Sequence, residues 1–147
     1  MKRVVGIGAL LACLLLYFSA ASAQNEYELT FGNYVVNYNT FPSTFLDKSI
    51  AKAAGVKRSD FQAVITIAVR QHVAGANDKP VKAVVSGNAT NLIGQIRKLK
   101  LSEVKDGSAI YYIGDFTFVR GEQMTFNMTV TPEGEKEKQE FKFTRQF

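Results

Sequence analysis

Strict alternation of apolar and polar residues is the clearest signal in the chain. In MTFNMTVT, residues 124–131, every second residue is apolar, beginning with Met124. Successive side chains of a β-strand point to opposite faces, so this pattern predicts a half-buried strand. FKFTRQF, residues 141–147, repeats the pattern, and the polar stretch PEGEKEKQ before it predicts a hairpin loop.

Further strands are predicted along the rest of the chain. In DFQAVITIAVRQ, Phe61 and each second residue to Val69 form an apolar face. Gly114 interrupts another strand where a bulge or a close backbone contact would sit. With the two strands above, the total is seven or eight. The other segments are YELTF (27–31), NYVVNYN (33–39), PVKAVVSGNAT (80–90), RKLKLSEV (97–104) and AIYYIGDFTF (109–118).

One short helix is predicted in LDKSIAKAAG, residues 46–55. Asp47 is a good N-cap, Gly55 fits a left-handed C-cap, and Ile50, Ala53 and Ala54 would share the apolar face. A lone short helix among closely spaced strands argues against a parallel α/β sheet. The pattern favours a mainly β fold, either a sandwich or a small barrel.

The N-terminus has the pattern of a secretory signal. Lys2 and Arg3 precede an apolar run, and small residues end at Ala23. We expect a cleaved signal over residues 1–23 and a single domain over 24–147, soluble in the periplasm. The apolar run is shorter than the ~20 residues of a membrane-spanning helix. Lipid attachment at Cys13, within the matching sequence LLAC, is the less favoured alternative.

The composition offers little catalytic chemistry. Cys13 is the only cysteine and would be removed with the signal, and His72 is the only histidine, so we expect neither a thiol nucleophile nor a conventional zinc site. No glycine-rich phosphate loop is present, and no cofactor is expected. The net charge of +5 falls by two once Lys2 and Arg3 are removed, which gives no reason to expect nucleic acid as a partner.

Two strands carry polar residues that their own pattern does not explain. In the strand from Tyr34, Asn37 and Asn39 present amides on the face opposite the apolar one. Phe41 and Pro42 should end this strand, because proline has no N–H to donate to a neighbour. Asp115 lies within an otherwise apolar strand, on the face of Tyr111, either as a solvent-facing acid or as part of a ligand site.

Several segments together resemble a family of small uncharacterised secreted proteins of gammaproteobacteria, a domain of unknown function. They are GNYVVNYNTFPSTFL, AAGVKRSDF, SGNATNLIGQ, IYYIGDF and MTFNMTVTPEG. The resemblance covers about residues 34–147 and implies a periplasmic protein with an immunoglobulin-like antiparallel β-sandwich and no assigned activity. The family often has histidine where this chain has Asn37, and if that histidine serves as a base or metal ligand in relatives, an amide could not do the same chemistry here. Other family positions are Arg58, Asn91, Gln95 and Tyr111.

Three functions are compatible with these observations. The favoured one is a non-enzymatic periplasmic module that binds a protein or a cell-envelope component. Lys98 and Lys100 are candidates for contact with an anionic envelope surface, and the sequence does not indicate an oligomeric state. The alternatives are a small outer-membrane β-barrel and an enzyme acting on envelope glycans or lipids. The candidate binding residues are Asn37, Asn39, Arg58, Asn91, Gln95, Tyr111 and Asp115.

If residues 1–23 are a cleaved signal, osmotic shock of intact cells should release the mature protein. Inhibition of the lipoprotein signal peptidase should leave its processing unchanged. Accumulation of a precursor under that inhibitor would instead show lipid attachment at Cys13.

Overall fold

The computed structural model describes residues 27–147. The expected signal over residues 1–23, the start of the domain at Gln24 and Cys13 all lie outside the described residues. Within residues 27–147, no helix is both long enough and apolar enough to cross a bilayer.

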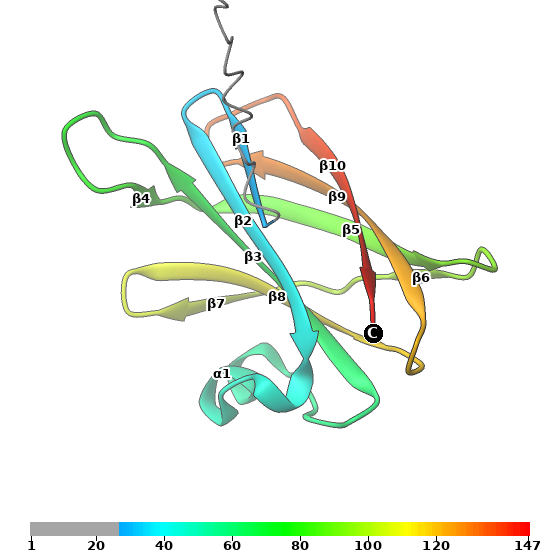
Figure 1. The fold of residues 1–147 in the computed structure, drawn as a ribbon. Coiled ribbons are helices and arrows are strands. Elements are labelled where there is room, and N and C mark those ends of the chain that lie inside the picture. The colour runs from blue at the N-terminus through cyan, green and yellow to red at the C-terminus, as the bar shows by residue number, and fades with distance from the viewer. Residues whose placement is uncertain (1–26) are drawn as a thin grey trace, which may run out of the picture.

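Two antiparallel sheets make up the protein (Figure 1). The six-stranded sheet, here sheet A, has the strand order β1-β2-β3-β8-β7, and β4 pairs with the far end of β3. Its strands are β1 (Glu28–Phe31), β2 (Tyr34–Pro42), β3 (Gln62–Gln71), β4 (Lys79–Pro80), β7 (Ser102–Asp106) and β8 (Ala109–Thr117). The four-stranded sheet, sheet B, has the order β10-β9-β5-β6. Its strands are β5 (Ala83–Asn91), β6 (Ile96–Lys98), β9 (Gln123–Pro132) and β10 (Gln139–Gln146).

The strand order confirms the predicted immunoglobulin-like sandwich. In immunoglobulin domains one sheet contains strands A, B, E and D, and the other contains C, F and G. Here β2-β3-β8-β7 has the order A-B-E-D, and β10-β9-β5 has the order G-F-C, with β6 added beyond C. β1 is a further edge strand next to β2.

Residues 27–147 contain ten strands, more than the seven or eight predicted, because two expected strands are divided between the sheets. The segment 80–90 pairs with β3 at Pro80 and then crosses to sheet B as β5. The segment 97–104 leaves sheet B after Lys98 and joins sheet A at Ser102. Apolar and polar residues alternate through both crossings, and Leu99 between the two sheets is buried. The local sequence pattern alone therefore does not reveal that the chain changes from one sheet to the other.

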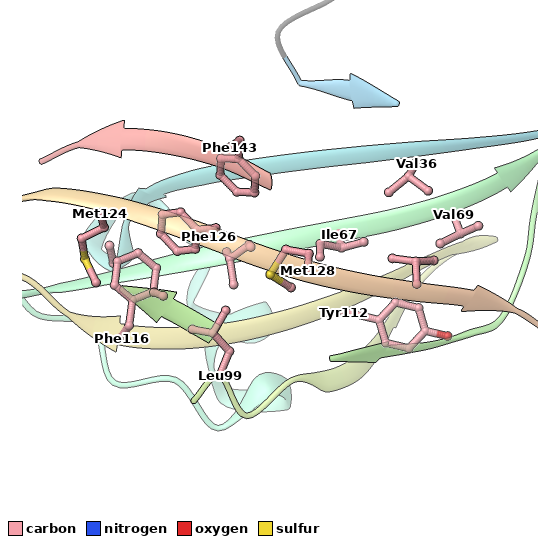
Figure 2. Packing of buried hydrophobic residues seen from close by; sticks show 14 residues of the cluster. Val36, Ile67, Val69, Leu99, Tyr112, Phe116, Met124, Phe126, Met128 and Phe143 are labelled. Carbon is pink, nitrogen blue, oxygen red and sulfur yellow. The ribbon is translucent and has the colours of Figure 1, made fainter. Parts of the chain in front are cut away.

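The layer between the sheets is built from the predicted apolar faces (Figure 2). Phe126 lies near its centre and stacks on Phe143 with ring centroids 4.8 Å apart, while Phe116 meets Phe126 edge-on at 5.2 Å. The terminal Phe147 also packs against this cluster, 5.3 Å from Phe116. The inward residues of β9 are all buried, as the sequence predicted: Met124, Phe126, Met128 and Val130.

Tyr112 ties the two sheets together at the other end of the layer. Its hydroxyl accepts a hydrogen bond from the Ala83 N–H at 2.8 Å and donates to a Glu103 carboxylate oxygen at 3.3 Å. Burial raises the pKa of Tyr112, so the phenol stays neutral. The bond to Ala83 fixes the chain where it enters sheet B.

Helix α1 (Lys48–Ala54) covers part of the outer face of sheet A and forms a second, smaller core there. Both predicted caps are confirmed: Asp47 accepts hydrogen bonds from the backbone N–H groups of Ser49 and Ile50, and Gly55 has a left-handed φ of 71°. The predicted apolar face is wrong in one position, because Ala51 rather than Ala53 is buried. Val64 and Ile113 of the sheet lie beneath the helix.

The connection from β2 into the helix follows the expected chemistry. β2 ends at Pro42, and the short 3₁₀ turn η1 (Ser43–Phe45) follows. The fully buried Ser43 hydroxyl donates to the Ser59 carbonyl and accepts from the Ser59 N–H. Phe61 was predicted to face the core and does not: it precedes the first residue of β3 and is 75% exposed.

Gly87 is required by close packing within sheet B. A Cβ at this position would lie 2.6 Å from the Asn127 carbonyl oxygen and would overlap the Met128 sulfur. Gly114, where the sequence suggested a close contact, leaves similar room for Leu101. At both positions the absence of a side chain leaves room for neighbouring atoms.

Replacing Gly87 with alanine should destabilise the protein by about 1–3 kcal/mol, because overpacking forces side chains and backbone apart. Urea unfolding measures this free energy. Ser86→Ala is the matched control on the exposed side of the same strand and should change it by less than about 0.5 kcal/mol. Equal stability of the two variants would contradict the packing role of Gly87.

Candidate functional site

The outer face of sheet A brings three of the predicted binding residues together. Strand pairing places Asn37 opposite Ala68 and Asn39 opposite Thr66. Tyr111 follows on the next strand, because its neighbour Tyr112 pairs with Ile67. These side chains surround a hollow of about 270 Å³, here called the Tyr111 hollow. Its lining residues are Tyr27, Asn37, Tyr38, Asn39, Thr66, Ala68 and Tyr111.

Two more hollows adjoin it and also include Tyr111. One, of about 240 Å³, extends past Arg70 toward Pro80. The other, of about 270 Å³, extends toward α1 and is lined by apolar side chains that include Phe41 and Phe45. Typical small-molecule pockets occupy roughly 300–1,000 Å³, so the combined surface has the size of a ligand site although each part is small.

Asn37 is held in place by charged neighbours. Its Nδ2 donates to a Glu28 carboxylate oxygen, and its Oδ1 accepts from the Arg70 Nε, both at 3.0 Å. Arg70 also lies 3.4 Å from an Asp78 carboxylate oxygen and 3.8 Å from Glu28. Arg70 is therefore shared between two carboxylates, and together with Glu28 it orients the Asn37 amide.

Asn39 has more freedom to meet a ligand. Its Oδ1 accepts a hydrogen bond from the Thr40 N–H at 2.8 Å, which leaves the Nδ2 side of the amide facing outward on an exposed residue. No side-chain partner for this Nδ2 is present among residues 27–147. Asn39 can therefore donate to a ligand without first breaking a protein hydrogen bond.

Arg58 and Asp115 lie outside these hollows. The Arg58 guanidinium donates to the Thr44 carbonyl and so holds the turn before α1. Asp115 accepts a hydrogen bond from the Gln62 side chain of the neighbouring strand. The structure thus gives both residues local contacts away from Tyr111.

Asn91 and Gln95 are on the other sheet, in the hairpin between β5 and β6. The Asn91 side chain accepts from the Gln95 N–H and donates to the Gln95 side-chain carbonyl, both at 2.9 Å. It also donates to a Glu122 carboxylate oxygen at 2.9 Å. Their amides join two loops and do not approach the Tyr111 hollow.

Glu122 is the centre of that junction. Its carboxylate accepts from Asn91, from the Val119 N–H at 2.9 Å and from the Arg97 guanidinium at 3.2 Å. Burial alone would raise the pKa of Glu122, but the hydrogen bonds from Asn91, Val119 and Arg97 outweigh it and lower the pKa below its ordinary value. The folded state therefore favours the ionised carboxylate.

His72 contacts a single acid. Its Nδ1 lies 3.0 Å from an Asp78 carboxylate oxygen at the exposed end of β3. Among residues 27–147, no group of three or more His, Cys, Asp or Glu side chains is placed to hold a metal ion.

Sequence reasoning missed most of the residues that line this surface, among them Thr66, Ala68 and Phe45. Thr66 and Ala68 occur in a strand whose apolar run hides its outer face, and Phe45 follows the strand end in a turn. The pairing of β2 with β3 could have identified the first two, since each faces one of the predicted asparagines.

The comparisons agree with the sandwich. The model of the family described as Domain of unknown function (DUF4426) matches residues 28–147. The crystal structure of a DUF4426 family protein from Pseudomonas aeruginosa PAO1 is similar, with a TM-score of 0.74 and 33% sequence identity, covering 82% of this chain and 92% of that chain. No curated protein matches the chain.

Changing Glu122 to glutamine should destabilise the protein at pH 7 by about 1.5–3 kcal/mol, the range for hydrogen bonds to charged groups. Because the folded pKa is lowered, the stability from ionised Glu122 is present above the unfolded value of about 4.5 and is lost as pH falls through the folded pKa. Urea unfolding of the wild type and of Glu122→Gln should therefore show a difference in the free energy of unfolding that becomes smaller below about pH 4.5.

Glu137→Gln, in the exposed β9–β10 loop, is the control for the loss of one surface charge. It should leave stability nearly unchanged at every pH. If the difference in the free energy of unfolding between Glu122→Gln and the wild type stays constant with pH, the charge of Glu122 is not what holds the two loops together.

Proposed function

The chain belongs to the DUF4426 family, and from this premise we propose that it is a non-enzymatic periplasmic binding module that holds a small neutral ligand at the Tyr111 hollow. The observation that carries the proposal is the meeting of Asn37, Asn39 and Tyr111 at one concave surface. The N-terminal signal pattern supports the periplasmic location.

The lining of the surface indicates the chemistry of the ligand. Tyr111 and Phe45 offer aromatic faces, while Asn39 and Thr66 offer hydrogen-bonding groups beside them. Ligand sites commonly combine apolar walls with a few polar groups that orient the ligand. A small molecule with one apolar face and a hydrogen-bonding edge, such as a sugar unit, fits this combination.

The charges argue for a neutral ligand. Arg70, the cation on this face nearest Asn37, already contacts Glu28 and Asp78. A charged ligand would have to compete with these ion pairs. A neutral one leaves them intact and uses the amide that they orient.

Photo-crosslinking in living cells tests the proposal even though the ligand is not yet identified. Phe45 is 79% exposed at the edge of the site, so its replacement by benzoylphenylalanine keeps an aromatic side chain in place. Illumination should give an adduct of discrete small mass by intact-protein mass spectrometry. Adding Tyr111→Ala should reduce the yield several-fold.

The same replacement at Phe61, which is 75% exposed and lines none of the three hollows, is the matched control. Labelling of both positions to the same extent would show that the adduct reports exposure and not a site. A protein-sized adduct at Phe45 would contradict a small ligand and would indicate a protein partner.

A further inference from the structure

Another hollow lies on the opposite side of the molecule, on the outer face of sheet B. It has a volume of about 690 Å³. It is lined from all four strands of the sheet, by side chains that include Ser86, Asn88, Lys98, Asn127, Thr129 and Lys142. None of the residues proposed above for the Tyr111 hollow contributes to it.

Strand register places four of these residues in one line across the sheet. Lys142 pairs with Asn127, Asn127 with Asn88, and Asn88 with Lys98. Paired residues of neighbouring strands share a face, so the line runs from one edge of the sheet to the other. Three strand spacings separate its ends by roughly 14 Å. We call this line the lysine–asparagine row.

The ends of the row are cations available to a ligand. Neither Lys98 nor Lys142 forms an ion pair within residues 27–147, and both are exposed. Glu140 is the one acid among the residues that line the hollow, and Lys138 contacts it at 2.8 Å. Two lysines and one acid line the hollow, so its lining carries net positive charge, and the acid already contacts Lys138.

The middle of the row offers hydrogen bonds. Asn127 donates from Nδ2 to the Asn88 Oδ1 at 3.2 Å, which aligns the two amides. Ser86 and Thr129, paired with each other, add hydroxyl groups alongside. Such groups suit a ligand that carries hydroxyls between its charges.

We propose that the outer face of sheet B binds an extended polysaccharide bearing carboxylate groups, which lies across the strands along the lysine–asparagine row. Two separated cations with amides and hydroxyls between them match a chain whose charges alternate with hydroxyl groups. Polyphosphate carries no hydroxyl groups within its chain, so it would give the amide and hydroxyl oxygens of the row no hydrogen-bond donor. Nucleic acid would lack a stacking partner, because no aromatic side chain points outward from these four strands.

Only one of the two lysines that the sequence suggested for an anionic surface lines this hollow. Lys98 lies in the hollow, but Lys100 does not line it, because the chain has already left sheet B. The second cation is Lys142, on a strand 44 residues later. Its place beside Asn127 follows from the β9–β10 hairpin.

Isothermal titration with polygalacturonate fragments long enough to span the row tests the proposal. Lys98→Gln and Lys142→Gln should each raise Kd about three- to fivefold, as expected for one exposed ionic contact, and the double variant about tenfold. Asn127→Ser should also weaken binding. Lys136→Gln removes one exposed lysine of the adjoining loop and should change Kd less than twofold.

Three results would overturn the proposal. One is no binding of polygalacturonate by the wild-type protein. A second is equal weakening by Lys142→Gln and Lys136→Gln, which would show diffuse charge attraction. The third is equal binding of a neutral galactan or of polyphosphate, which would show that the row does not select a carboxylated glycan. Thermal unfolding of each variant confirms that it is folded.

The experiment is independent of the Tyr111 hollow. Tyr111→Ala should leave polygalacturonate binding unchanged, and Lys142→Gln should leave the crosslink at Phe45 unchanged. Either site can therefore fail its own test while the other passes.

Discussion

The apolar layer around Phe126 is the constraint on which the rest of this protein depends. Phe126, Phe143 and Phe116 meet from both sheets, and the long strands of both sheets turn alternate residues toward them. A shift of one residue in the pairing of any strand would turn its apolar side chains to solvent. The layer therefore fixes the register, and the register decides which polar residues become neighbours on the outer faces.

Much of the fold could be predicted because its signals are local. Alternation identified the main strands, and the residues that cap the helix have the required chemistry on their own, as with Asp47 and Gly55. The wrong predictions concern residues whose burial is decided by tertiary contacts. Phe61 continues the alternation but precedes the strand, and Ala51 is buried because α1 rests on Val64 and Ile113. Both crossings between sheets leave the alternation undisturbed.

The candidate sites were less predictable for the same reason. Asn37 and Asn39 could be selected within one strand, and strand pairing does bring Tyr111 to them. Asn91 has the same kind of side chain, yet its amide is occupied by Gln95 and Glu122, which only the meeting of two loops reveals. The sequence of its own strand does not mark Lys142 as a candidate binding residue, because that role depends on Asn127, Asn88 and Lys98, which lie in line with it on the other strands.

The two outer faces differ because only one of them is partly covered. On sheet A, α1 supplies a wall beside the strands, so Tyr111 and Phe45 can form a confined, partly apolar surface. Within residues 27–147 no helix covers sheet B, and its outer residues include hydroxyls, amides and lysines in rows set by the strand pairing. Confinement suits a small ligand, whereas an open row suits an extended one. The buried layer, about 10 Å thick, separates the two surfaces, so substitutions on one should add to those on the other without coupling.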